Sequence, residues 1–403
     1  NKTHTDMLNS RDYPNALNHM ATYGLLDAAR SSTNPPKNKK GRFIFTSVGG
    51  NNLKEIVPGI GEEIGGNCKK VETQWIDQKT KEVKRLGALL DFGSYLIKTK
   101  SDWSAGHPDV VEDLKNCKNV FITHHHLDHI DGLIPYIKRG LIGRGHTVHM
   151  TPEVYDMLNS KLTKAGIKKD DHRRPQINIL EGTGVIDLHD DRGICRMSVA
   201  YGVDAVPHSA KDTPFIAYGR HDKEILGSYM YLGDMRFDEE WFEDHPSAFW
   251  DPQKLMLEHD PELNPEHCIP TYTEIDGTSV RQQGRSTSER VVRDNISHVI
   301  NEWCPESPVL VAMIGTTDGR RESLLEIANR TNRNITAWGA AVVDIFKIGN
   351  KCGINPYKTP RPASFQMMMK QIRDGVSPYN VEHPPSSTYT GIKDYLEFNA
   401  QKL

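Results

Sequence analysis

The stretch Thr123-His124-His125-His126-Leu127-Asp128-His129-Ile130-Asp131-Gly132 decides how this sequence is interpreted. It follows the apolar run 119–123, which predicts a buried strand. We expect its donor residues to lie in a loop between that strand and a helix beginning near Asp131. A strand end followed by a turn can direct several side chains into one pocket, and imidazole and carboxylate groups suit Zn²⁺ or Mn²⁺. The candidate metal ligands in this stretch are His124, His126, Asp128 and His129.

Two further candidate ligands follow later strands. His208 lies in Pro207-His208-Ser209, and Asp234 follows Leu232-Gly233. We expect His124, His126 and His208 to hold one ion, Asp128 and His129 to hold a second, and the Asp234 carboxylate to bridge the two. A purely structural histidine cluster is the alternative, but four donor residues within a short span after a strand favour metal binding. His146 and His149 lie near another predicted strand and are expected to be structural.

Composition places few limits on function. The 403 residues are 37% hydrophobic and 26% charged, with a net charge of −3, which is typical of a soluble globular protein. Binding to nucleic acid would therefore need a local basic groove. The six cysteines are scattered without a Cys-x-x-Cys pair, so we expect reduced thiols. Because no apolar run is long enough to span a bilayer and no charged-then-apolar leader opens the chain, we expect a cytoplasmic protein without membrane contact.

Periodicity predicts the remaining elements. We expect strands at 43–45, 89–93, 197–200, 214–218, 228–233 and 255–257, and a helix from the N-cap Thr151 to Gly166. A capping box at Ser286-Thr287-Ser288-Glu289 predicts a helix reaching Trp303. A strand at 308–314, a helix at 321–329 and a strand at 335–338 would complete a small parallel α/β unit. The predicted divisions are a polar extension over 1–40, a first domain over 41–284 and a second over 285–403.

The metal motif, His-x-His-x-Asp-His, resembles the signature of the metallo-β-lactamase fold. The wider context resembles the β-CASP branch of that fold, and within it the ribonuclease J family. The matching segments are Gly61–Asn67, His208-Ser209 with the later Asp212, and Gly233–Asp238. Asp276-Gly277-Thr278-Ser279, Gly284 and Ser288-Glu289 follow the spacing at the entry to the β-CASP insertion, and similar spacing continues to residue 339.

The resemblance implies an α/β fold, a metallo-β-lactamase αββα sandwich with an inserted β-CASP α/β domain. It implies a ribonuclease that uses a hydroxide shared by two divalent ions, Zn²⁺ first and Mn²⁺ as the alternative, to attack single-stranded RNA. Asp128, Asp234 and Asp276 would be catalytic, Asp276 through its support of leaving-group protonation. The residues implied to contact RNA are Ser209, Thr316, Thr317 and Arg320, with Thr316-Thr317 replacing the family's Ser-Asn. A homo-oligomer is also implied.

The last two histidine motifs of the family are not found in this sequence. We therefore expect an incomplete β-CASP domain and a second ion held more weakly than the first. Two alternatives stay open beside the ribonuclease. One is another metallo-β-lactamase-fold hydrolase, such as a cyclic-nucleotide phosphodiesterase, and the other is a catalytically impaired subunit that binds RNA or supports assembly.

Overall fold

The computed structural model describes residues 41–49, 63–98, 103–206, 211–234, 250–274, 288–303, 305, 309 and 318–332. These residues form two compact units, one holding the described residues from Gly41 to Glu274 and the other those from Ser288 onward. The predicted division at 284–285 falls in segment 275–287, outside the described residues. Among the helices that are described, none is both long and apolar enough to cross a membrane.

The first unit contains a six-stranded mixed sheet. Its order is β1 (Gly41–Gly49), β3 (Cys68–Ile76), β4 (Val83–Leu90), β7 (Cys117–Phe121), β8 (Thr147–Met150) and β9 (Gln176–Ile179). β1, β3 and β4 are antiparallel neighbours, whereas β4, β7, β8 and β9 run parallel. Loops that follow β4 and β7 therefore leave the sheet at the same edge.

A five-stranded sheet packs against the first. It contains β10 (Thr183–His189), β11 (Cys195–Gly202), β12 (Phe215–His221), β13 (Glu224–Tyr231) and β14 (Tyr272–Glu274). Its neighbours are antiparallel except β14, which is parallel to β13. A small third sheet is formed by β2 (Glu63–Gly65), β5 (Tyr95–Lys98) and β6 (Trp103–Gly106).

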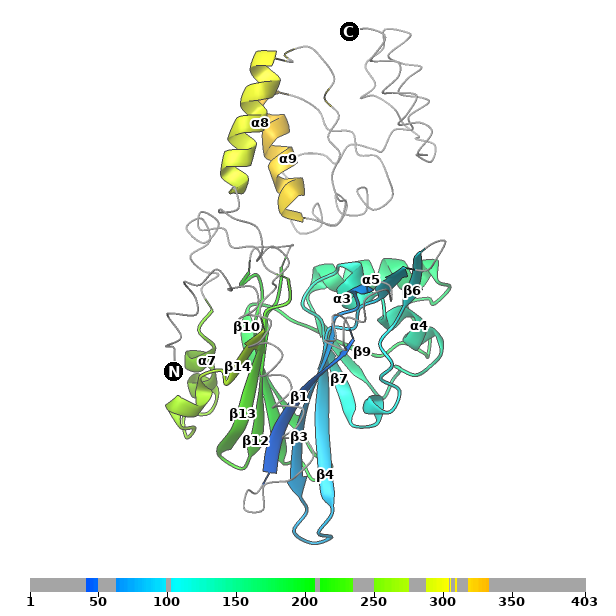
Figure 1. Ribbon diagram of the computed structural model, residues 1–403, viewed down its shortest axis with the longest axis vertical. Coiled ribbons are helices and arrows are strands. Elements are labelled where there is room, and N and C mark those ends of the chain that lie inside the picture. Colours follow the sequence, from blue (N-terminus) through cyan, green and yellow to red (C-terminus); the bar gives the residue numbers. More distant parts are fainter. Residues whose placement is uncertain are drawn as a thin grey trace. The chain divides into compact units, whose positions relative to one another are not determined.

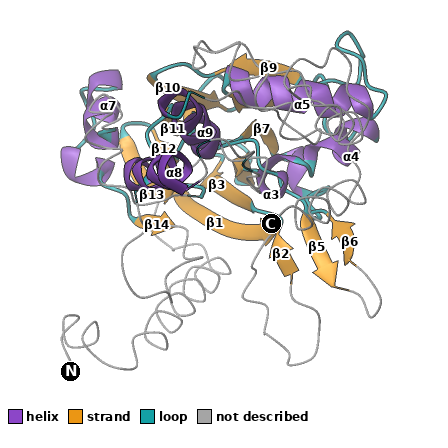
Figure 2. Ribbon diagram, turned by 90° about the horizontal axis from the view of Figure 1, so that it is seen from above, coloured by secondary structure: helices purple, strands orange, loops and turns teal. Residues whose placement is uncertain are grey.

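Helices cover the outer faces of the two large sheets (Figures 1 and 2). On the first sheet lie α3 (Leu127–Ile130), α4 (Leu133–Lys138) and α5 (Pro152–Lys164), with the 3₁₀ turn η1 (Asp113–Lys115). On the second sheet lie α7 (Pro252–His259) and the 3₁₀ turn η3 (Pro265–Cys268). As predicted, α5 begins after Thr151, whose hydroxyl accepts from the Val154 amide, and Gly166 follows its end with φ +82°.

The described residues form three hydrophobic cores, and these show the order of the layers. Leu89 of β4 packs with Leu133 and Leu158 beneath the helices, whereas its neighbour Leu90 faces the other sheet and packs with Phe215. Successive side chains of a strand point to opposite faces, so β4 is buried on both of its faces. A third core joins the second sheet to α7 through residues such as Met256. The layers are therefore helix, sheet, sheet and helix, and the predicted αββα sandwich is confirmed.

Three local predictions are wrong. Residues 255–257 lie in the helix α7 instead of a strand, because Asp251 accepts from the Lys254 amide and Pro252 occupies the first helical position. The histidine run leads directly into α3, so Asp128 and His129 lie on a single helical turn and not in a loop. The capping residue of α8 is Ser288, whose hydroxyl accepts from the Val291 amide, and not the predicted Ser286.

The second compact unit contains two described helices, α8 (Glu289–Trp303) and α9 (Asp318–Arg330). The Ser323 hydroxyl donates to Glu289, and Arg330 pairs with Asp294. The second pair lies further along the chain than the first in both helices, so α8 and α9 run parallel. Parallel helices are expected when a strand connects them, as in the predicted α/β unit. The strands predicted at 308–314 and 335–338 lie outside the described residues, apart from the isolated Val309.

Candidate metal centre

The histidine run is fixed to the neighbouring strand through Thr123. Its amide donates to Oδ1 of Asp91 over 2.8 Å, and its hydroxyl lies 3.0 and 2.9 Å from the two Asp91 oxygens. The same hydroxyl lies 2.9 Å from Nδ1 of His124. Because the hydroxyl proton goes to the carboxylate, the oxygen accepts from Nδ1–H of His124. The lone pair of His124 is then on Nε2.

Asp91 orients a second histidine. This carboxylate is fully buried just after β4, and its Oδ2 lies 2.6 Å from Nδ1 of His129. Burial, together with the charge of the nearby Asp91 carboxylate, raises the pKa of Tyr231 well above its ordinary value. A carboxylate that accepts Nδ1–H leaves Nε2 of the imidazole as the free donor atom, which is the usual arrangement behind a metal-binding histidine. The sequence interpretation missed Asp91, although it follows a recognisable apolar strand.

Two backbone contacts fix the turn that carries Asp128 and His129. The amide of Asn67 donates to the Asp128 carbonyl over 2.7 Å, and the Gly93 amide donates to the Asn67 carbonyl over 2.9 Å. A Cβ atom on Gly93 would lie 1.6 Å from the Asp128 carbonyl oxygen, so this approach requires glycine. The side-chain amide of Asn67 lies 2.8 Å from Nε2 of His129 and 3.4 Å from Oδ2 of Asp128. Asn67 therefore reaches the same donor atoms, a role that the sequence motif alone did not indicate.

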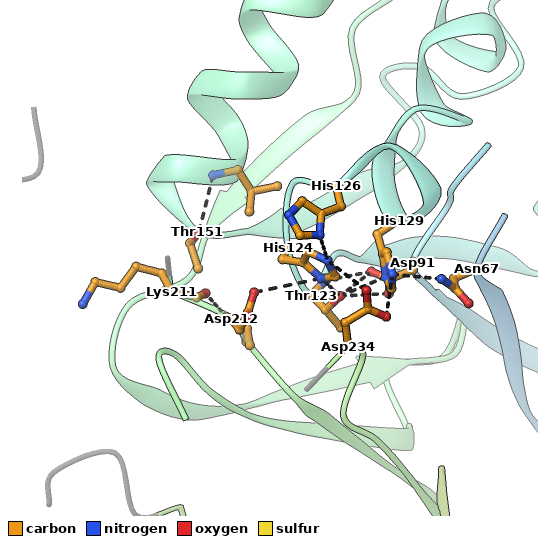
Figure 3. A network of polar contacts seen from close by, with 12 residues as sticks. Asn67, Asp91, Thr123, His124, His126, His129, Thr151, Lys211, Asp212 and Asp234 are labelled. Carbon is orange, nitrogen blue, oxygen red and sulfur yellow. Dashed lines mark hydrogen bonds and ion pairs between the residues drawn. The ribbon is translucent and has the colours of Figure 1, made fainter. Parts of the chain in front are cut away.

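Asp234 enters from the other sheet, shortly after β13. The preceding Gly233 has φ +66°, and a Cβ there would lie 2.9 Å from the Thr123 hydroxyl. This position therefore favours glycine both for its backbone angle and for its space. The turn places Oδ1 of Asp234 3.1 Å from Nε2 of His129 and Oδ2 3.8 Å from Nε2 of His124 (Figure 3).

The structure brings five of the six predicted ligands together in two groups. His124, His126 and Asp234 each offer one ligand atom, and these atoms lie within 4.8 Å of one another. Asp128, His129 and Asp234 form a second group by the same measure. Asp234 belongs to both, as expected of a bridging carboxylate, whereas His125 belongs to neither.

The donor chemistry of the two groups fits divalent cations. Nε2 of His124 and Nδ1 of His126 are 2.9 Å apart, so two ring nitrogens face each other beside a carboxylate. Burial would lower the pKa of His129, but the Asp91 and Asp234 carboxylates beside it raise that pKa well above its ordinary value. Positive charge is thus favoured where the acidic and imidazole groups converge. Imidazole and carboxylate ligands are those that Zn²⁺ and Mn²⁺ accept.

A further buried carboxylate approaches from the loop after β11. Asp212 is 1% exposed, and its Oδ1 lies 4.0 Å from Nδ1 of His124. The sequence interpretation noted Asp212 only as a residue trailing His208. The amide of the next residue, Thr213, donates to the Thr123 carbonyl, which ties this loop to the histidine run.

Several predicted site residues lie outside the described residues. These are His208, Ser209, Asp276, Thr316 and Thr317. Arg320 belongs to α9 in the second compact unit. The described ligands therefore come from two segments of the first unit, the run after β7 and the turn after β13. Their supports come from the turn after β4, from Asn67 before β3 and from the loop after β11.

No protein-family model matches the chain. Among solved structures, a long form of RNase Z from yeast is similar over 52% of this chain, at 13% identity and a TM-score of 0.33. This chain covers 32% of the yeast structure, about a third of its length. The short form of human tRNase Z is similar over 60% of this chain and 96% of its own, at 11% identity and a TM-score of 0.27. A metallo-β-lactamase from Hirschia baltica is similar over 44% and 73%, at 12% identity and a TM-score of 0.20.

Proposed function

We propose that this chain is a metal-dependent hydrolase that cleaves phosphodiester bonds in single-stranded RNA, as ribonuclease J-like enzymes do. The position of Asp234 is the observation that supports metal dependence, because its two carboxylate oxygens face nitrogens of His124 and His129. One carboxylate shared by two groups of donors is the arrangement needed to hold two cations side by side.

The ligands divide between two ions. His124 and His126, with His208 as a further ligand, would hold the first, and Asp128 with His129 would hold the second. Asp234 would bridge them. When bound, two such ions would lower the pKa of a water molecule and would stabilise the negative charge that develops on a phosphate during hydrolysis.

The chain itself supplies the orientation. Asp91 and Thr123 hold the Nδ1 sides of two imidazoles, so that both Nε2 atoms are directed to Asp234. Asn67 contacts the acidic and imidazole groups of the second set. Because Asp91 and Thr123 are buried, they reduce the freedom of the ligands before any cation binds.

The choice of RNA comes from the resemblance of residues 276 to 339 to the β-CASP insertion. The parallel packing of α8 and α9 supports an α/β unit in this region. In this proposal Asp276 supports protonation of the leaving group. Ser209, Thr316, Thr317 and Arg320 contact the RNA phosphates.

The proposal is tested by supplying zinc or manganese and assaying an end-labelled single-stranded RNA beside cyclic AMP. We expect cleavage of the RNA, and a loss of at least about 100-fold when Asp234 is changed to Asn. His172→Gln is the matched control, because the His172 side chain is 80% exposed and belongs to neither donor group. If the chain hydrolysed cyclic AMP and did not cleave RNA, the proposed ribonuclease activity would be wrong and the chain would be a cyclic-nucleotide phosphodiesterase. If the chain bound RNA without cleaving it, the proposed activity would also be wrong and the chain would be a non-catalytic RNA-binding subunit.

A further inference from the structure

A different set of metal-type donors lies in the hairpin formed by β10 and β11. The carboxylate of Asp187, the imidazole of His189 and the thiol of Cys195 each offer an atom, and these atoms lie within 4.8 Å of one another. Cys195 begins β11, whereas the loop that carries Asp212 follows the other end of that strand. These donors are therefore separated from the candidate metal centre by the length of β11.

An irregularity in strand pairing brings the three side chains to one face. Leu188 pairs with Met197, and both lie in the core between the sheets, so their neighbours Asp187 and His189 face outward. The next pair is His189 with Cys195, which leaves Arg196 as an extra residue on β11. The Arg196 guanidinium lies over the Trp75 ring at 4.4 Å, on the inner side. The bulge thus turns Cys195 outward, to the face of Asp187 and His189.

Neighbouring groups orient the Asp187 carboxylate. Its Oδ1 accepts from the Ser198 hydroxyl over 2.6 Å, and its Oδ2 lies 3.0 Å from Nε2 of His259 on α7. Arg220 donates to the same Ser198 hydroxyl, but its charge is paired with Asp260. The carboxylate is therefore held in place from two sides, as ligand carboxylates commonly are.

We propose that Asp187, His189 and Cys195 bind a divalent cation of the Zn²⁺ class. A thiolate, an imidazole and a carboxylate are all zinc ligands, and water would complete a tetrahedral site. Tetrahedral coordination requires donor atoms about 3.3–3.8 Å apart, given the usual bond lengths. The three donor atoms lie within 4.8 Å of one another, so cation binding would draw them closer together. The bound cation would join the two strands at the end of their hairpin, beside α7.

Cobalt distinguishes this site from the candidate metal centre. Co²⁺ bound to a thiolate gives a sulfur-to-metal charge-transfer band, whereas the described donors of the candidate centre are nitrogen and oxygen atoms. We expect titration of the full, metal-free chain with Co²⁺ to produce that band. Cys195→Ser should abolish this band. His189→Gln should weaken the cobalt affinity measured from the band by at least tenfold. Cys268→Ala is the matched control, and its band should persist.

Two results would overturn the proposal: a wild-type chain without the thiolate band, or a band that survives in Cys195→Ser. Circular dichroism of each variant establishes that it is folded. Should Cys195→Ser fail to fold, His189→Gln decides alone, because His189 is an exposed residue. Unchanged cobalt binding in that variant would then reject the site. Since the band reports only thiolate coordination, the outcome does not depend on whether the chain cleaves RNA.

Discussion

Asp91 is a single residue on which much of the candidate centre depends. It is fully buried and adopts φ +59°, and it receives hydrogen bonds from Thr123 and His129. A buried carboxylate of this kind is stable only when its oxygens are satisfied. Its position therefore couples the end of β4 to the orientation of the ligands after β7.

Changing Asp91 to Asn should weaken zinc binding by about 10- to 100-fold, because the amide no longer stabilises the orientation and charge of the His129 ring. Asn is compatible with the positive φ, so the fold should persist. Competition with a zinc chelator measures the effect. Asp222→Asn is the matched control, since Asp222 also has positive φ (54°) but lies on a surface turn. Equal zinc affinity in the Asp91 variant and the wild type would contradict this role.

Gly93 sets how closely two backbone segments approach. Gly93→Ala would place a Cβ 1.6 Å from the Asp128 carbonyl oxygen, so the turn carrying Asp128 must move. We expect a loss of about 3 kcal/mol of stability in thermal unfolding, together with weaker zinc binding. At Gly145, where a Cβ would meet nothing within 4 Å, the same substitution should be nearly neutral. A Gly93 variant as stable as the Gly145 variant would show that the turn can yield at little cost.

The sequence predicted the ligands better than their supports. The histidine run was recognised because its donors are adjacent and follow an apolar strand. Asp91 and Asn67 were missed because each is one polar residue whose role depends on contacts with residues distant in the sequence. The donor group of Asp187, His189 and Cys195 was missed for a similar reason, since a strand bulge brings Cys195 to the face of Asp187.

At the scale of elements, β1, β4, β7, β11, β12 and β13 were predictable because each contains a short apolar run. β3 was not predicted, because buried polar residues such as Glu72 and Gln74 interrupt its apolar pattern. The segment 255–257 was misread, because three apolar residues cannot distinguish a strand from one turn of a helix. Asp251 and Pro252, at the start of the segment, indicate a helix, because they suit the N-cap and the first helical position. The one-turn helix α3 was missed because its ligands were expected to need a loop.

β8 supplies a prediction about pH. His149 is buried, with its ring stacked on Phe121 at 4.2 Å between the side chains of Asn119 and Asn178. Burial lowers its pKa to about 4. Because the folded pKa lies below the unfolded value of about 6.5, the unfolded chain binds the proton more readily. The stabilising contribution is therefore complete above pH 6.5 and is lost as the pH falls toward 4.

Urea unfolding at pH 7 and pH 5 measures this contribution. The unfolding free energy of the wild type should fall between pH 7 and pH 5. In His149→Gln this fall should be about 2 kcal/mol smaller, because the protonation of His149 no longer contributes. His172→Gln, at an exposed position, should keep the wild-type decrease. The same decrease in all three proteins would mean that His149 is not a source of the pH dependence.

At the scale of the whole molecule, the αββα sandwich provides the framework of the site. Two sheets packed through one core bring the turn after β13 next to the run after β7, although Asp234 and His129 are 105 residues apart. The sequence predicted this framework from the metal motif and not from the order of its strands. The predicted division into a sandwich and a second α/β domain remains a proposal.

Crystals soaked in zinc and measured at the zinc absorption edge test the shared role of Asp234 most directly. We predict two anomalous peaks about 3.5–4 Å apart, one beside His124 and His126, the other beside Asp128 and His129, with the Asp234 carboxylate contacting both. Lower occupancy is expected at the second peak. A single peak, or two peaks of which only one contacts Asp234, would contradict a bridged pair of cations.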